Sequence, residues 1–237
     1  MSTEKITSSP FSGAVVGTIH SAGALKAALK LPRGTVDFLE LRLDSFVTES
    51  GNEEKTLLKK IVNLPAPLLV TARDSREGAV NPLSWTRRLA LYREFLKHAS
   101  LIDVELRNAS RARALLEEAH QAGVKVIFSH HDFRAMPSPE RLVALKQKAQ
   151  EAGGDVFKVA AMAKTPAALA TLVQFMAAHR PKEIALAAMG MGPLGKTSRL
   201  VMGRLGSVLN YGFLDRLQVP GQWPAEVLKR LLAELSS

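Results

Sequence analysis

Short runs of apolar and β-branched residues recur along the chain, and segments with the periodicity of amphipathic helices lie between them. Eight of these runs predict strands, at residues 14–19, 36–41, 67–71, 101–106, 125–129, 156–160, 184–188 and 207–211. Helical periodicity is clearest at residues 81–98, 108–121, 138–152, 165–179 and 223–235. Ser138 and Thr165, each followed by proline, mark two helix starts, and Gly123 marks a helix end. This alternation predicts an α/β fold.

The number of strand–helix units favours one α/β architecture over another. Eight units in 237 residues match the size of a (β/α)8 TIM barrel, and we expect one such domain over residues 1–237. A doubly wound open sheet is the alternative, because alternation alone does not show that the sheet closes. The glycine-rich dinucleotide fingerprint of that fold does not follow the first predicted strand, where the chain reads VVGTIHSAG.

Composition argues against several classes of function. The chain has no cysteine, which excludes disulfides, thiolate catalysis and cysteine-ligated metal sites. The polar opening MSTEKITSSPFSG lacks the apolar stretch of a signal peptide, and no segment has the apolar length of a membrane span. We therefore expect a cytoplasmic protein that does not bind a membrane. The net charge of +10 is dispersed and aromatic residues make up only 5%, which argues against nucleic acid and favours a small anionic substrate.

One lysine lies inside a segment that predicts a buried strand. Lys158 interrupts the otherwise apolar run GDVFKVAAM. Burial lowers the pKa of a lysine, and the neutral amine is a nucleophile that forms Schiff bases with carbonyl compounds. The alternative is a structural lysine whose stem packs on apolar neighbours while its ammonium group reaches water.

Polar residues at the ends of other predicted strands accompany this lysine. Side chains at positions i and i+2 of a strand point the same way, and in a TIM barrel the carboxyl ends of the strands surround the active site. An amine nucleophile needs a proton carrier such as histidine, and arginine binds carboxylates through two donors. If the barrel closes, we expect one histidine, one glutamate and several arginines to converge with the lysine on one cavity. The polar and methionine residues noted on or after these strands are Glu40, Arg42, Arg73, Glu77, Asp103, Glu105, Ser129, His131, Met189, Met191 and Arg199.

These residues also have structural interpretations, which the pattern leaves open. Glu40 and Arg42 could form an ion pair within the barrel, and Asp103 and Glu105 could bond to basic or backbone groups there. His131 could be a hydrogen-bonded core histidine. No metal site is predicted, because neighbouring histidines on a strand point in opposite directions and no His-x-x-x-His pair occurs. The segment GMGPLGK lacks the earlier glycine of a phosphate-binding loop.

Seven short motifs together resemble one enzyme family. ELRLD, TARDSREG, IDVEL, SHHDF, FKVAAM, MGMG followed by SRL, and VPGQ occur in the order found in the type I 3-dehydroquinate dehydratases, from Glu40 to Gln222. The resemblance implies a TIM barrel, usually a homodimer, that needs no metal or organic cofactor. It also implies the shikimate-pathway reaction in which 3-dehydroquinate loses water to give 3-dehydroshikimate.

The resemblance assigns roles residue by residue. Lys158 matches the Schiff-base lysine, His131 the general acid/base, and Glu77 the glutamate that partners this histidine. The residues that it places around the substrate are Thr18, Glu40, Arg42, Arg73, Met189, Met191, Arg199, Tyr211, Gln218 and Gln222.

Three positions depart from the family pattern. Tyr211 stands where phenylalanine is usual, Gln218 where serine is common, and Ala79 replaces the second glycine of EGG. Two other functions stay open: a lysine-dependent aldolase on the same barrel, and a non-catalytic basic binding module.

Overall fold

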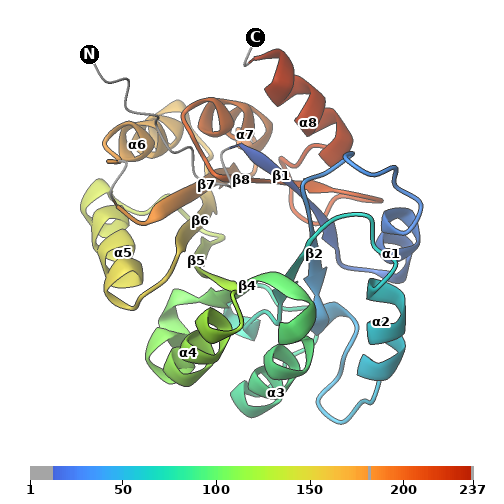
Figure 1. The fold of residues 1–237 in the computed structure, drawn as a ribbon. Coiled ribbons are helices and arrows are strands. Elements are labelled where there is room, and N and C mark those ends of the chain that lie inside the picture. The colour runs from blue at the N-terminus through green and yellow to red at the C-terminus, as the bar shows by residue number, and fades with distance from the viewer. Residues whose placement is uncertain (1–12, 181–182, 236–237) are drawn as a thin grey trace, which may run out of the picture.

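A computed structural model describes residues 13–180 and 183–235, in which eight strands form one sheet surrounded by helices (Figure 1). From β1 to β7 each strand pairs in parallel with the next one along the chain, and the first strand also pairs with the last. This order confirms the TIM barrel and excludes the doubly wound sheet. The strands are β1 (Ala14–Ile19), β2 (Phe38–Arg42), β3 (Leu68–Thr71), β4 (Ala99–Glu105), β5 (Lys125–Asp132), β6 (Val156–Met162), β7 (Ala185–Met191) and β8 (Leu209–Phe213).

The seam between β7 and β8, both wholly within the described residues, closes without a regular ladder. The backbone N–H of Val208 donates to the carbonyl of Leu186 at 2.8 Å. Two residues after Leu186, the backbone N–H of Ala188 donates to the buried hydroxyl of Ser207 at 3.1 Å. A side chain thus replaces a ladder bond at the seam and satisfies a buried amide.

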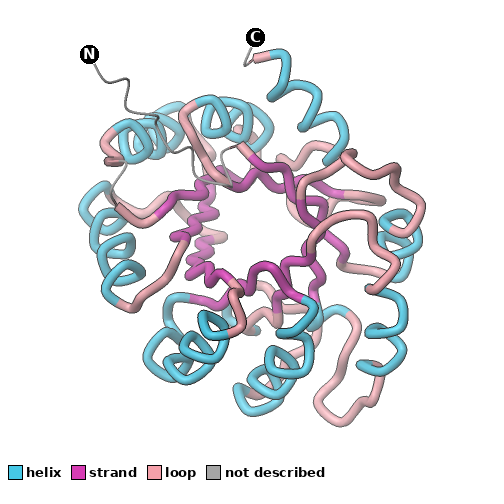
Figure 2. The backbone as a smooth tube through the Cα atoms, in the orientation of Figure 1, coloured by secondary structure: helices cyan, strands magenta, loops and turns pink. Residues whose placement is uncertain are grey.

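The helices cover the outside of the strand ring, as Figure 2 shows in cyan around magenta. The sequence signals for their ends are confirmed: Ser138 accepts a bond from Arg141 N, Thr165 accepts one from Ala168 N, and Gly123 has φ +73. The helices are α1 (Ala22–Ala28), α2 (Glu54–Ile61), α3 (Trp85–Phe95), α4 (Arg113–Gln121), α5 (Pro139–Glu151), α6 (Pro166–Ala177), α7 (Gly195–Arg204) and α8 (Ala225–Glu234).

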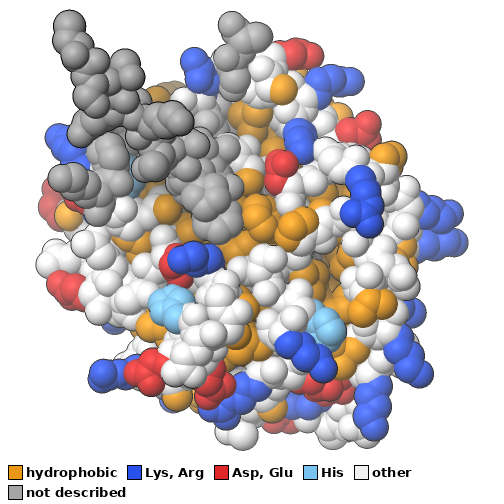
Figure 3. All heavy atoms as spheres, in the orientation of Figure 1, with side chains coloured by type: hydrophobic (Ala, Val, Ile, Leu, Met, Phe, Trp, Pro, Cys, Tyr) orange, Lys and Arg blue, Asp and Glu red, His pale blue; other side chains and the backbone are white. Residues whose placement is uncertain are grey.

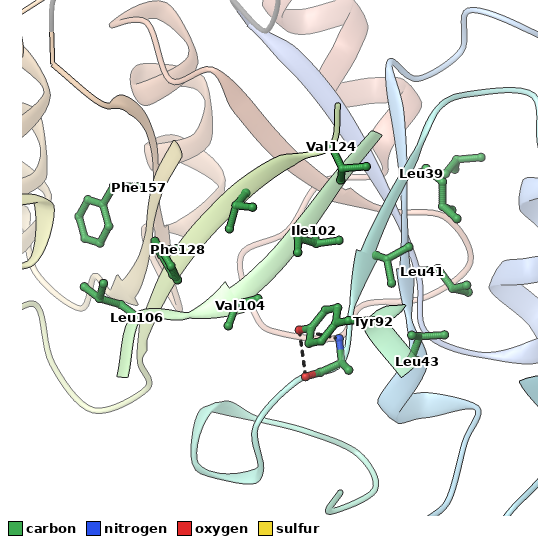
Figure 4. Packing of buried hydrophobic residues seen from close by; sticks show 14 of the residues in the cluster. Leu39, Leu41, Leu43, Tyr92, Ile102, Val104, Leu106, Val124, Phe128 and Phe157 are labelled. Atoms are coloured by element: carbon green, nitrogen blue, oxygen red, sulfur yellow. Dashed lines mark hydrogen bonds between the residues drawn. The ribbon is translucent and has the colours of Figure 1, made fainter. Parts of the chain in front are cut away.

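The main apolar core lies between the strands and the helices. Outward side chains of neighbouring strands, such as Leu39, Ile102 and Phe128, pack there with side chains from the helices (Figure 4). Tyr92 of α3 joins this core and uses its hydroxyl to bond the backbone of Ala72, which the dashed lines in Figure 4 mark. Burial of this layer on folding is the main stabilising term for the barrel.

Inward side chains form two zones along the barrel axis. An apolar zone contains Val16, Leu69, Leu101, Ile127, Val156 and Leu209. Two positions later on the same strands, and therefore on the same face, stand Thr18, Thr71, Asp103, Ser129, Lys158 and Tyr211. Because inward side chains recur at every second residue, a polar layer lies next to the apolar layer, on the side of the carboxyl ends of the strands.

Several strands continue beyond their predicted ends. β5 runs to Asp132 and β7 to Met191, because polar and glycine residues that read as loop are strand residues here.

The described residues contain no helix long and apolar enough to cross a membrane. Lys and Arg side chains are spread around the visible face in Figure 3 without forming one patch. The single domain over residues 1–237 stays a prediction.

Candidate active site

A cavity of about 510 Å³ opens at the carboxyl ends of the strands. All of the predicted catalytic and substrate-binding side chains line it, so residues far apart in the sequence meet in one place. They are Thr18, Glu40, Arg42, Arg73, Glu77, His131, Lys158, Met189, Met191, Arg199, Tyr211, Gln218 and Gln222. Their convergence is a structural result, and their individual roles stay predictions.

Lys158 lies at the bottom of this cavity and is only 3% exposed. Its Nζ donates to Oδ2 of Asp103 at 2.8 Å and lies 4.1 Å from the centroid of the Tyr211 ring. The interpretation in which the ammonium group reaches bulk water is therefore wrong. The carboxylate and the ring face both stabilise a cation, so the amine must lose a proton before it can attack a carbonyl carbon.

Glu77 and His131 form the second reactive pair. Oε2 of Glu77 accepts bonds from both the backbone N–H of His131, at 3.0 Å, and its ring Nδ1, at 2.9 Å. When Glu77 is ionised it can only accept, so Nδ1 then carries the proton of this bond and Nε2 keeps its lone pair. The imidazole is thus fixed in one orientation with its basic nitrogen free.

A short turn after β3 positions this glutamate. Residues Ser75–Glu77 form a 3-10 helix that begins with a bond from Arg76 N to the side chain of Asp74 and ends at Gly78, where φ is 89°. The left-handed conformation falls on glycine, which adopts it without strain. Ala79 is not left-handed, so the departure from the EGG pattern leaves the turn intact.

Burial shifts the pKa values of this pair in opposite directions. Burial raises the pKa of Glu77 to about 7, against the opposing effect of Arg73. Burial, together with the positive charges of Arg73 and Lys158, holds the pKa of His131 well below its usual range. At neutral pH the imidazole is therefore uncharged and able to accept a proton.

A network of buried charges supports the lysine from the side of β3, β4 and β5. Arg73 donates through Nη1 to Asp103 at 3.0 Å, to Glu105 at 3.1 Å and to Ser129 at 2.8 Å. Arg88 of α3 bonds the other oxygen of Glu105. Burial opposes the ionisation of both groups. The positive charges of Arg73 and Lys158 nevertheless hold the pKa of Asp103 well below its usual value, and the negative charges of Asp103 and Glu105 hold the pKa of Arg73 well above its usual value.

The ion pair considered for Glu40 and Arg42 does not form. Glu40 accepts the hydroxyl of Thr71 at 2.9 Å, whereas Arg42 makes a two-pronged pair with Asp44 at 3.0 and 2.9 Å. Asp44 also accepts the backbone N–H of Arg73, which ties the ends of β2 and β3 together. Both side chains still line the cavity.

Arg199 reaches the opposite wall from α7. Its guanidinium donates to backbone carbonyls, those of Tyr211 (3.1 Å), Gly190 (2.8 Å), Gly195 (3.1 Å) and Gly221 (2.6 Å). Among the described residues, no carboxylate pairs with it and Nη2 has no hydrogen-bond partner. Burial lowers its pKa to about 10.

The segment after β8 covers this wall. Oε1 of Gln222 accepts the backbone N–H groups of Gln218 at 3.1 Å and Val219 at 3.4 Å. Gly221 lies against the turn before α7, where a Cβ added to Gly195 would lie 2.7 Å from the Cα of Gly221. Two glycines thus allow the segment to approach the cavity.

Sequence reasoning missed part of the site. Asp103, which contacts the lysine, was noted on its strand but was interpreted mainly as a structural residue and received no role in the reaction. Its position two residues before Glu105 on an inward face was the available signal. Four other lining residues lie within the quoted motifs but were not assigned to the site: Gly78, Phe133, Ala160 and Val219. Five lie outside the motifs: His20, Ser45, Val80, Arg216 and Leu217.

Comparison with known proteins gives a consistent result. A family model described as type I 3-dehydroquinase matches residues 15–237. A 3-dehydroquinate dehydratase from Klebsiella pneumoniae subsp. pneumoniae is 36% identical over 209 residues, which are 84% of this chain and 83% of the relative.

Two solved structures extend the similarity to the fold. The 3-dehydroquinate dehydratase from Geobacillus kaustophilus has a TM-score of 0.85 at 27% identity, covering 94% of this chain and 91% of that one. The type I 3-dehydroquinate dehydratase from Clostridium difficile, solved with covalently modified comenic acid, has a TM-score of 0.83 at 28% identity, covering 94% and 92%. The chain therefore belongs to the type I 3-dehydroquinase family.

Proposed function

We propose that this protein removes water from 3-dehydroquinate to give 3-dehydroshikimate through a Schiff base on Lys158. The observation that carries the proposal is a buried lysine that shares one cavity with a fixed, uncharged imidazole. Family membership supports the reaction, and the geometry supplies roles for the side chains.

The first step joins Lys158 to the substrate. Its ammonium group loses a proton to His131, whose ring is held by Glu77 through Nδ1 and whose Nε2 is available to accept it. The amine then attacks the ring ketone, and His131 returns the proton to the carbinolamine hydroxyl, which leaves as water and gives an iminium ion while the imidazole becomes neutral again. Asp103, 2.8 Å from Nζ, aims the amine and stabilises the positive charge of the iminium.

The second step uses the iminium as an electron sink. His131 removes the proton from the adjacent carbon, and the same imidazole then protonates the departing hydroxyl group. Glu77 fixes the ring through Nδ1 and stabilises its charged form while it holds the proton. Hydrolysis of the iminium releases the product and restores the amine.

Arg199 is the best candidate to bind the substrate carboxylate. It is a buried cation without a carboxylate partner in the described chain, and Nη2 is free. The side chains of Met189 and Met191 supply an apolar wall that helps to exclude water from the reacting atoms.

The geometry disfavours the two other functions that the sequence left open. An aldolase with a phosphate site at GMGPLG would need free amides there, but Gly192, Leu194 and Gly195 donate to the carbonyls of Pro220, Ala163 and Gly192. A non-catalytic module would have no need for a buried lysine beside a fixed imidazole. The homodimer, which the family resemblance implies, and the cytoplasmic location, which was expected from the sequence, belong to the same proposal.

The direct test is ultraviolet absorbance after addition of 3-dehydroquinate, because the product is a conjugated enone. We expect a steady rise with the unmodified protein and none with Lys158→Met, which keeps the length of the side chain. Lys125→Met, at a half-exposed lysine on the other end of the neighbouring strand, is the matched control and should be fully active. No rise with the unmodified protein would refute the proposed reaction.

A further inference from the structure

The two tyrosines of the chain are both buried, but only one has its hydroxyl satisfied. The Tyr92 hydroxyl donates to the carbonyl of Asp103 at 2.6 Å and accepts from the backbone of Ala72 at 3.1 Å. The Tyr211 side chain lines the reaction cavity, and its hydroxyl is enclosed and has no hydrogen-bond partner among the described residues. A buried hydroxyl without a partner destabilises a fold, so its presence needs a reason.

The surroundings of Tyr211 keep its hydroxyl a donor. Burial first, and then the negative charges of Glu40 and Asp103, hold its pKa well above its usual value. Neighbouring hydroxyls are already used by the fold, since Thr71 donates to Glu40 and Ser129 donates to Asp103. The Tyr211 hydroxyl is therefore an uncharged hydrogen-bond donor that no other group of the described fold uses.

The position of the ring places this donor beside the reacting carbon. Nζ of Lys158 lies 4.1 Å from the ring centroid, so a substrate carbon bonded to Nζ lies over the ring or at its edge. The hydroxyl stands on the same ring. Glu40 lines the same cavity and supplies acceptor oxygens near it.

We propose that the Tyr211 hydroxyl is a specificity-determining group that donates a hydrogen bond to a ring hydroxyl of the substrate while Lys158 holds the ketone carbon. That substrate hydroxyl donates in turn to Glu40, so one group on the ligand satisfies a donor and an acceptor of the wall. The inference rests on the proposed function and deepens it: the protein selects a polyhydroxylated cyclic ketone over one that lacks this hydroxyl.

Tyr211→Phe isolates the hydroxyl, because the ring beneath Nζ is kept. We expect KM for 3-dehydroquinate to rise about tenfold, the equivalent of one hydrogen bond, with kcat changed by less than about threefold. In the absence of substrate, Tm of the variant should equal or exceed that of the unmodified protein, because an unpaired buried hydroxyl is removed. Tyr92→Phe is the matched control, with a lower Tm and an unchanged KM.

The outcomes separate this inference from the proposed function. If the unmodified protein does not turn over 3-dehydroquinate, both fail. If it does, and Tyr211→Phe has a KM within twofold of the unmodified protein, only the role of the hydroxyl fails, and bound water is its partner. A Tm for Tyr211→Phe as low as that of Tyr92→Phe would also overturn the inference, since the hydroxyl would then be structural.

Discussion

The cavity has two buried arginines on opposite walls, Arg73 and Arg199, and each is 2% exposed. Arg73 bonds to two carboxylates and a hydroxyl, whereas Arg199 bonds to backbone carbonyls alone. Their pKa values move apart accordingly: that of Arg73 is raised, because its acidic partners outweigh burial, and burial lowers that of Arg199 to about 10. Two equally buried arginines thus differ in pKa because only Arg73 has carboxylate partners.

This difference indicates what each wall does. On the wall of Arg73, the fold supplies the counter-charges, and the network holds Lys158 in place through Asp103. On the wall of Arg199, the fold supplies dipoles that orient the guanidinium but no opposite charge. An anionic substrate would supply it, and for that reason we place the substrate carboxylate there.

The largest expected effect is on stability, for Arg73→Met. Removal of this cation leaves Asp103 and Glu105 buried beside each other without their shared partner. We expect the free energy of unfolding to fall by about 3–5 kcal/mol, measured by chemical denaturation. A loss below about 1 kcal/mol would show that the two walls do not differ as described.

A second effect is on the pH dependence of stability, for Glu77→Gln. The pKa of Glu77 in the folded protein is about 7, above its ordinary value of 4.5. Burial raises this pKa, and the nearby positive charge of Arg73 lowers it by less than burial raises it. The favourable contribution of protonated Glu77 is fully present below pH about 4.5 and is lost as pH rises through about 7. Glutamine does not titrate, so the variant should gain up to roughly 3 kcal/mol relative to the unmodified protein between these limits. Parallel stability–pH curves for the two proteins would contradict the raised pKa.

The third effect is on binding, for Arg199→Met. Loss of the uncompensated cation should raise KM for 3-dehydroquinate by roughly 10- to 100-fold, as expected for a hydrogen bond to a charged group. The free energy of unfolding should fall by less than for Arg73→Met, because removing Arg199 leaves no buried carboxylate without its partner. An unchanged KM would move the carboxylate site away from this wall.

The smallest effect is expected at the surface, for Arg76→Ala. Arg76 pairs with Asp74 at 3.0 Å, but its side chain is 56% exposed. We expect a loss of less than about 1 kcal/mol in the free energy of unfolding, decreasing further with added salt. A loss comparable with that of Arg73→Met would mean that burial does not set the strength of these pairs.

The sequence predicted the barrel and the residues of the cavity, but not how they pair. Strand periodicity and the motif order are local signals, and they predicted that Lys158, His131 and Glu77 share one cavity, which all three line. Only His131 lies near a strand end, since Lys158 is inside β6 and Glu77 lies in the turn after β3. The contact between Lys158 and Asp103 depends on the stagger of β4, β5 and β6, which no single segment encodes.

The other wall was less predictable for the same reason. The carbonyl cage of Arg199 exists only because Gly221 packs against Gly195, a contact between segments that meet after folding. The short helix Ala22–Ala28 was also not singled out, because seven residues give little helical periodicity.

The most direct test of the account is reduction with borohydride during turnover of 3-dehydroquinate, followed by peptide mass analysis. We expect one reduced substrate adduct on the peptide that contains Lys158, and none on the peptide that contains Lys125. Turnover without any adduct on Lys158 would contradict the imine, and with it the account of a cavity built around one reactive amine.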